Sequence, residues 1–187
     1  MRTLTAFNSV SLDGYFVDAT GDMSWAHQGA DAEWNEFVSG NARGGGTLVF
    51  GRVTYQMMAG YWPSPMAKKN DPVVAERMSA LPKVVFSRTL TDASWRNTTL
   101  VSNDMSGAIR RMKKEPGDGM VILGSGTIVA QLTQQKLIDE YQIVVIPVVL
   151  GGGRTMFEGV KDKPRFKLTG SRTFRNGNAM LCYQPQT

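Results

Sequence analysis

Apolar runs and helical patterns alternate along most of the chain, and the runs indicate where strands are expected. Strands are expected at residues 4–10, 47–50, 83–86 and 120–123, with a short further strand around 99–101. The run 120–123 has no polar alternation, which is typical of a strand covered on both faces. Such a spacing of strands and intervening segments predicts a sheet whose neighbouring strands are joined through helices.

Helical periodicity fills the segments between these runs. Asp31 is expected to cap a first helix, a second opens at Arg52, and Asp71-Pro72 combines a capping residue with a proline suited to the first helical position. Pro116-Gly117 ends a later helix. The expected buried faces are Trp34, Phe37 and Val38 in the first helix, Val74, Met78 and Leu81 after Asp71, Met105, Ile109 and Met112 before Pro116, and Ile128, Val129 and Leu132 in the last.

The last third of the chain has the pattern of antiparallel strands. A long β-branched run over 138–150 predicts one strand, and residues 166–174 and 179–183 predict a hairpin closed by the turn dipeptide Asn176-Gly177. The whole pattern predicts an α/β fold with a mostly parallel sheet, helices on both faces and antiparallel C-terminal strands. In such sheets ligands bind at the carboxyl ends of the strands.

Composition narrows the classes of protein. A length of 187 residues is expected to form one domain over 1–187. One cysteine and one histidine exclude a disulfide framework and a Cys- or His-based metal cluster, so no metal is expected. A net charge of +5 suits an anionic ligand but is too small to imply nucleic acid. No signal sequence or apolar membrane span is evident, so a cytoplasmic protein without a membrane partner is expected.

Three of the expected strands end in polar segments suited to phosphate. These are Gly51-Arg52-Val53-Thr54, Ser87-Arg88 and Gly124-Ser125-Gly126-Thr127. The third is a glycine turn leading into a helix N-terminus, where free N–H groups and the helix dipole favour an anion. Each segment alone is also explained by a simple turn, a capped helix or a surface arginine. If the strands are parallel neighbours, the three segments share one edge and could hold a ligand with several phosphates.

The motifs also resemble those of a known family. Ser11-Leu12-Asp13-Gly14, Gly124-x-Gly126-Thr127, Leu137-Ile138-Asp139-Glu140 and Pro147-Val148-Val149-Leu150-Gly151-Gly152 resemble motifs of the dihydrofolate-reductase-like superfamily. The match is specifically to the reductase domain of the riboflavin-biosynthesis deaminase-reductases and covers nearly the whole chain. The zinc deaminase signature H-x-E with P-C-x-x-C is missing, so the resemblance implies a stand-alone reductase.

The resemblance implies that the ligand is NADPH. Arg52 and Thr54 would then contact phosphates, Ser87 and Arg88 the adenosine 2′-phosphate, and residues 124–128 the pyrophosphate. An NAD site tends to have a carboxylate at the ribose, whereas a phosphate at that position favours arginine. Ser87-Arg88 therefore favours NADPH independently of the resemblance. The expected cofactor-binding residues are Gly14, Gly51, Arg52, Thr54, Ser87, Arg88, Gly124, Ser125, Gly126, Thr127 and Ile128.

The candidate catalytic residues are Asp13 and Asp31. Asp13 would line the nicotinamide end of the site, unless it only forms the Asp-Gly turn. Dihydrofolate reductases have a carboxylate five residues after a tryptophan; here Ala30 holds that position and Asp31 follows, a rotation of about 100° on a helix that argues against pterin recognition. His27 is either a proton relay or an ordinary loop residue.

Three functions are compatible with these features. The first is an NADPH-dependent reductase that transfers a hydride to a small heterocyclic substrate, pterin- or pyrimidine-like, or to a carbonyl substrate. The second is the 5-amino-6-(5-phosphoribosylamino)uracil reductase of riboflavin biosynthesis. The third is a nucleotide-binding protein without catalysis. By analogy with the resembling domain, the 138–150 strand and the C-terminal hairpin are expected to form a homodimer contact.

Overall fold

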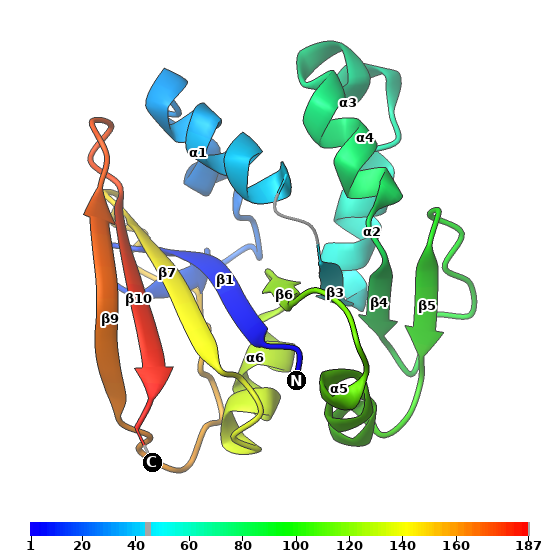
Figure 1. Ribbon diagram of the computed structural model, residues 1–187. Coiled ribbons are helices and arrows are strands. Elements are labelled where there is room, and N and C mark those ends of the chain that lie inside the picture. Colours follow the sequence, from blue (N-terminus) through cyan, green and yellow to red (C-terminus); the bar gives the residue numbers. More distant parts are fainter. Residues whose placement is uncertain (44–45, 187) are drawn as a thin grey trace.

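An eight-stranded sheet runs through the protein (Figure 1). The computed structural model describes residues 1–43 and 46–186. The strands lie in the order β5-β4-β3-β6-β1-β7-β10-β9, and β10 is antiparallel to both neighbours while the other pairs are parallel. Their bounds are β1 Leu4–Ser11, β3 Thr47–Gly51, β4 Lys83–Phe86, β5 Thr98–Val101, β6 Met120–Leu123, β7 Glu140–Ile146, β9 Phe166–Thr173 and β10 Ala179–Pro185. This arrangement confirms the predicted fold class.

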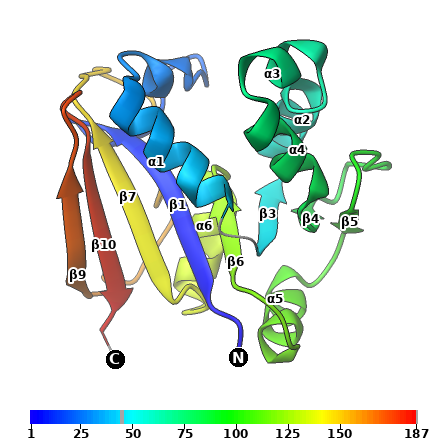
Figure 2. The ribbon, with the colours of Figure 1, turned by 45° about the horizontal axis from the view of Figure 1, so that its top comes forward.

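Helices cover both faces of this sheet, with α1 in front and α6 behind in Figure 2. The helices are α1 Ala32–Arg43, α2 Arg52–Tyr61, α3 Pro65–Asn70, α4 Pro72–Ala80, α5 Met105–Lys114 and α6 Gly126–Gln134, with a short 3₁₀ turn, η1, at Ser24–His27. Side chains alternate along β1, so Leu4 and Ala6 pack with α5 and α6, whereas Phe7 packs on the α1 side against Phe37. A second cluster joins β3 and β4 to α2 and α4.

Several helix starts follow the expected local chemistry. Asp31 and Asp71 each accept a backbone hydrogen bond three residues on, from Trp34 and Val74. The expected stripe of α4 is buried, as are the three expected residues of α6. Val38 is a wrong prediction, since 38% of its surface is exposed. The packed apolar residues of α1 are Trp34 and Phe37, which contact Phe174, and Val38 is outside this set.

The prediction of one strand over 138–150 is also wrong. β7 ends at Ile146, because Pro147 has no N–H for the ladder. The chain then stays beside the end of β1, with the Val148 carbonyl accepting a hydrogen bond from the Leu12 N–H. Helix α3 and a two-stranded sheet, formed by β2 (Tyr15–Val17) and β8 (Arg154–Thr155), were not expected from the sequence.

The C-terminal hairpin matches its prediction except at the turn. The N–H of Phe174 bonds the carbonyl of Asn178, and the N–H of Gly177 bonds the carbonyl of Phe174. Three residues therefore lie between the last paired positions, instead of Asn176-Gly177 alone. Gly177 has φ +88°, the left-handed conformation that glycine adopts readily.

Candidate functional site

The three polar segments lie at one edge of the sheet. Strand β3 pairs in parallel with β4 on one side and with β6 on the other. Their last residues, Phe86, Gly51 and Leu123, therefore lie at the same edge of the sheet, which we name the carboxyl edge. The segments beginning at Gly51, Ser87 and Gly124 follow directly. Tertiary structure thus brings together three pieces of chain that the sequence places far apart.

Two of these segments are hydrogen-bonded to each other. The N–H of Gly51 donates to Ser125 Oγ at 2.8 Å, and the N–H of Ser125 donates to Thr54 Oγ1 at 3.1 Å. Gly124 and Ser125 both have left-handed backbones, with φ +60° and +62°. A Cβ added at Gly124 would lie 2.8 Å from Thr54 Oγ1, so the close approach requires glycine. The two hydroxyls therefore position the turn, and direct phosphate contacts by them stay a prediction.

The helices that begin at this junction differ from the others in their N-termini. Helices α3, α4 and α5 are each capped by a side chain, from Ser64, Asp71 and Asp104. Helices α2 and α6 have no side-chain cap, since Gly51 has no side chain and Ser125 Oγ bonds elsewhere. The first-turn N–H groups of both helices are therefore available to an anionic ligand at the carboxyl edge.

The charged side chains at this edge are exposed. Arg52 bonds Gln56 Oε1 at 3.0 Å along its own helix. Ser87 Oγ accepts hydrogen bonds from the N–H groups of Thr89 and Leu90 and so shapes the turn after β4. Arg88 makes no hydrogen bond or ion pair with any described residue, which leaves its guanidinium available.

The remaining residues expected to bind the cofactor differ in how far their side chains are exposed. Thr127 is exposed in the first turn of α6. Ile128 is buried against the core, so only its backbone can serve a ligand. An added Cβ at Gly126 would lie 3.2 Å from the ring of Phe16, which brings the first loop close to this turn. Gly14 lies in that loop, exposed, with φ +86° in the turn closed by the Ser11 carbonyl.

Asp13 ties two loops together. Its Oδ1 accepts hydrogen bonds from Ser11 Oγ at 2.6 Å and from the Leu150 N–H at 3.1 Å, and its Oδ2 accepts one from the Gly151 N–H at 2.8 Å. The Ser11 hydroxyl, with the two backbone donors, lowers the pKa of this carboxyl to about 2. Asp13 is therefore ionised at neutral pH and holds no proton to donate.

The carboxylates at the start of α1 also have structural partners. Asp31 caps the helix through the Trp34 N–H at 2.8 Å. Glu33 accepts hydrogen bonds from Arg172 Nη2 and the Arg175 N–H, which lowers the pKa of its carboxyl and joins α1 to the C-terminal hairpin. His27 is exposed at the end of η1. Neither Asp31 nor Glu33 is thus a free buried acid.

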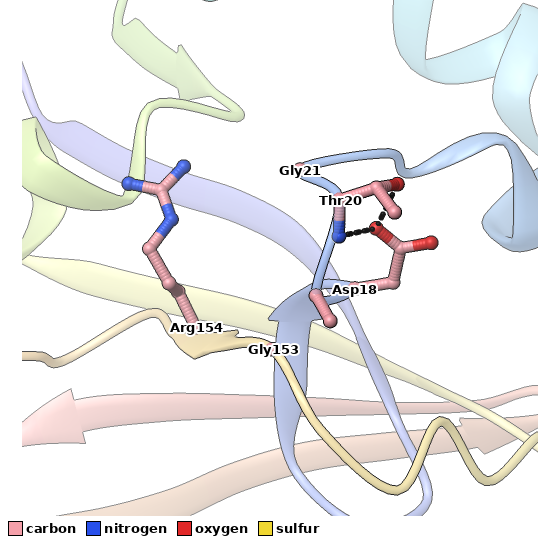
Figure 3. A pocket seen from close by; sticks show the side chains of 6 residues that line it. Asp18, Thr20, Gly21, Gly153 and Arg154 are labelled. Atoms are coloured by element: carbon pink, nitrogen blue, oxygen red, sulfur yellow. Dashed lines mark hydrogen bonds between the residues drawn. The ribbon is translucent and has the colours of Figure 1, made fainter.

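The structure adds residues that sequence analysis did not single out. A cavity of about 460 Å³ lies beside the small sheet. Figure 3 shows Arg154 on one side of it and Asp18, Thr20 and Gly21 on the other. Asp18 bonds its own loop, through the N–H and Oγ1 of Thr20. Asn8, on β1, is buried with no partner for its amide among the described residues. The sequence did not distinguish it, because Thr5, Ser9 and Ser11 are further polar residues of the same strand.

Two kinds of feature are absent from the described ranges 1–43 and 46–186. No group of three or more His, Cys, Asp or Glu side chains there is arranged to hold a metal ion. No helix in those ranges combines the length and apolarity needed to span a bilayer.

The mixed sheet and its strand order are those of the dihydrofolate-reductase-like fold. The chain belongs to the RibD C-terminal domain family, whose model matches residues 2–180. It is similar to the uncharacterized protein YyaP of Bacillus subtilis (strain 168), at 26% identity over 94% of this chain and 90% of the relative.

Solved structures share the fold. A protein from Shewanella sp. PV-4, provisionally assigned to riboflavin biosynthesis, superposes with a TM-score of 0.72 at 21% identity, over 99% of both chains. Dihydrofolate reductase from Enterococcus faecalis, in a complex with NADP(H), superposes with a TM-score of 0.64 at 14% identity, over 99% of this chain and 97% of that one.

Proposed function

We propose that this protein is an NADPH-dependent reductase that transfers a hydride to a small heterocyclic or carbonyl substrate. The observation that carries the proposal is the meeting of two helix N-termini without side-chain caps, α2 and α6, at the carboxyl edge beside the free guanidinium of Arg88. Membership of a reductase-domain family supports it, as does the NADP(H) complex of a protein with the same fold.

The residues present fit this cofactor. The first-turn N–H groups of α6 suit the pyrophosphate, Arg52 at the start of α2 suits a neighbouring phosphate, and Ser87 with Arg88 suits the 2′-phosphate. When bound, NADPH supplies the hydride. The chain's own part is to bind and orient. Asp13 contributes by holding residues 150–151 against the first loop and, being ionised, leaves the proton to solvent.

The start of α1 supports a ranking of substrate classes. A folate reductase needs a free carboxylate here, whereas Asp31 uses its Oδ1 to cap the helix and Glu33 bonds Arg172 and the Arg175 N–H with its two oxygens. Pyrimidine-like and carbonyl substrates therefore rank above pterins. Family membership also favours a second candidate, the 5-amino-6-(5-phosphoribosylamino)uracil reductase of riboflavin biosynthesis.

The test is a titration with NADPH and NADH followed by a turnover assay. We expect NADPH to quench tryptophan fluorescence and to bind more tightly than NADH. Oxidation followed by absorbance with pterin, pyrimidine and carbonyl panels then identifies the substrate class. Binding without turnover on any panel would favour a nucleotide-binding protein without catalysis, and the absence of binding would refute the proposal.

We further propose that the protein is a homodimer that pairs through its C-terminal strands. Strand β9 is at the end of the sheet, so one of its sides has no strand partner. Leu168 on β9 is 51% exposed, an apolar side chain that a second copy would cover. Light scattering after gel filtration at micromolar concentration should give about twice the 20.5 kDa chain mass. A monomeric mass would refute it.

A further inference from the structure

Asn8 is a polar side chain buried without a partner. Only 3% of its surface is exposed. Neither its Oδ1 nor its Nδ2 forms a hydrogen bond within the described part of the chain. An unpaired buried amide costs free energy, because both its donor and its acceptor have lost water. Buried amides in native proteins are usually paired, so this one needs an explanation.

The position of Asn8 connects it to the candidate site. Side chains alternate along β1, so Asn8 lies on the same face as Leu4 and Ala6, the face covered by α6. The preceding residue, Phe7, is in register with Leu123, the last residue of β6. Asn8 is therefore level with the turn at Gly124 that leads into α6.

The strand order indicates which part of a dinucleotide would lie there. Along the sheet the order is β4, β3, β6 and β1. The proposed 2′-phosphate site follows β4, and the proposed pyrophosphate site follows β6. A dinucleotide extended along the carboxyl edge in this direction reaches β1 with its nicotinamide end. Asn8 is on that strand.

Resting on the proposed function, we propose that the Asn8 amide recognises the carboxamide of the nicotinamide ring. A side-chain amide offers one acceptor oxygen and an N–H donor, and a carboxamide offers the complementary pair. Two hydrogen bonds would then satisfy both groups and set the orientation of the ring. Asn8 is on this account a positioning residue whose unpaired state in the free protein is a cost of ligand recognition.

The competing explanation is a purely structural asparagine hydrated by a buried water. The two explanations differ for Asn8→Leu, which has similar size and no polar atom. A recognition residue, once replaced, leaves the free protein equally or more stable and weakens NADPH. A water-bound structural residue, once replaced, destabilises the free protein and leaves the affinity for NADPH unchanged.

The experiment measures thermal unfolding without ligand and dissociation constants for three probes. The probes are NADPH, its 3-acetylpyridine analogue, in which a methyl group replaces the carboxamide nitrogen, and 2′,5′-ADP, which lacks the nicotinamide half. In Asn8→Leu we expect about a ten- to hundredfold weaker affinity for NADPH, no remaining preference for NADPH over the analogue, and unchanged 2′,5′-ADP binding. Asn8→Ala repeats the test should the leucine variant not fold.

Thr98→Val is the matched control. Thr98 Oγ1 is likewise buried without a partner among the described residues. Thr98 is the first residue of β5, however, so it lies at the amino ends of the parallel strands, opposite the carboxyl edge. This variant should bind all three probes as the wild type does. Unchanged affinity for NADPH in Asn8→Leu and Asn8→Ala overturns the inference alone, because 2′,5′-ADP still reports on the phosphate sites. A wild type that binds neither NADPH nor 2′,5′-ADP overturns the proposed function and this inference with it.

Discussion

The N–H of Gly51 donates a 2.8 Å hydrogen bond to Ser125 Oγ, across 74 positions of sequence. This bond joins the end of β3 to the turn that follows β6, and the reciprocal bond from the Ser125 N–H to Thr54 Oγ1 closes the junction. The junction holds the starts of α2 and α6 side by side. One serine side chain therefore joins the two helix ends that we propose as phosphate sites.

Two substitutions at Ser125 measure separately how its hydrogen bond and its left-handed backbone affect stability. Ser125→Ala leaves the Gly51 N–H without its acceptor and should lower the free energy of unfolding by about 1–3 kcal/mol. Ser125→Gly loses the same bond but relieves the φ of +62°, worth about 1 kcal/mol. Urea unfolding should therefore rank the wild type first, the glycine variant second and the alanine variant last. An alanine variant as stable as the wild type would show that the bond contributes nothing.

Asp13 makes the loop at 150–151 sensitive to acid. Its pKa is about 2 in the folded protein, below the ordinary 3.8, so its stabilising effect is complete above pH 4 and is lost as the pH falls towards 2. Amide hydrogen exchange at Leu150 and Gly151, corrected for intrinsic rates, should show protection falling in that window. Asp13→Asn should have low protection at every pH. The control Asp92→Asn, at an exposed position, should behave as the wild type.

Lys83 should make stability rise in mild alkali. Its Nζ is buried and donates to the carbonyls of Met78, Ser79 and Leu81 at the end of α4. Burial lowers the pKa of this ammonium from 10.5 to about 8. Between these values the unfolded chain binds more protons, so the free energy of unfolding rises with pH. The stability of the wild type relative to Lys83→Met should therefore increase from pH 7 to pH 10; parallel pH profiles would contradict this.

Arg88 should determine the preference for NADPH over NADH. If its free guanidinium binds the 2′-phosphate, Arg88→Gln loses a charge-assisted contact worth about 1.5–3 kcal/mol, which is roughly a ten- to hundredfold weaker affinity for NADPH. Affinity for NADH, which lacks that phosphate, should not change. Arg110→Gln, an exposed arginine of α5, is the matched control. Equal losses for both cofactors in Arg88→Gln would show that Arg88 contacts another part of the ligand.

Local features of the sequence were sufficient for the fold class. Apolar runs located the strands, Asp71 located a helix start, and the glycines around Ser125 located a strand-to-helix turn. Each depends on residues within a few positions of one another. Their meeting at one edge was expected only if the strands were parallel neighbours, and the observed pairing of β3 with β4 and β6 fulfils that condition.

The features that could not be predicted from the sequence depend on contacts between residues far apart in the chain. Pro147 ends β7 while the β-branched run continues, and Val38 is exposed although Trp34 and Phe37 of the same helix are packed. The bonds from the Asp13 carboxylate to backbone 137 and 138 positions away could not be predicted from the sequence, and its place at the nicotinamide end stays a prediction. Asn8 stood out only once its neighbours were known. Sequence by itself determined most of the elements that form, because backbone propensity and periodicity are local. Tertiary structure decided which polar groups are hydrogen-bonded and which are left for a ligand, because that pairing depends on residues far apart in the chain.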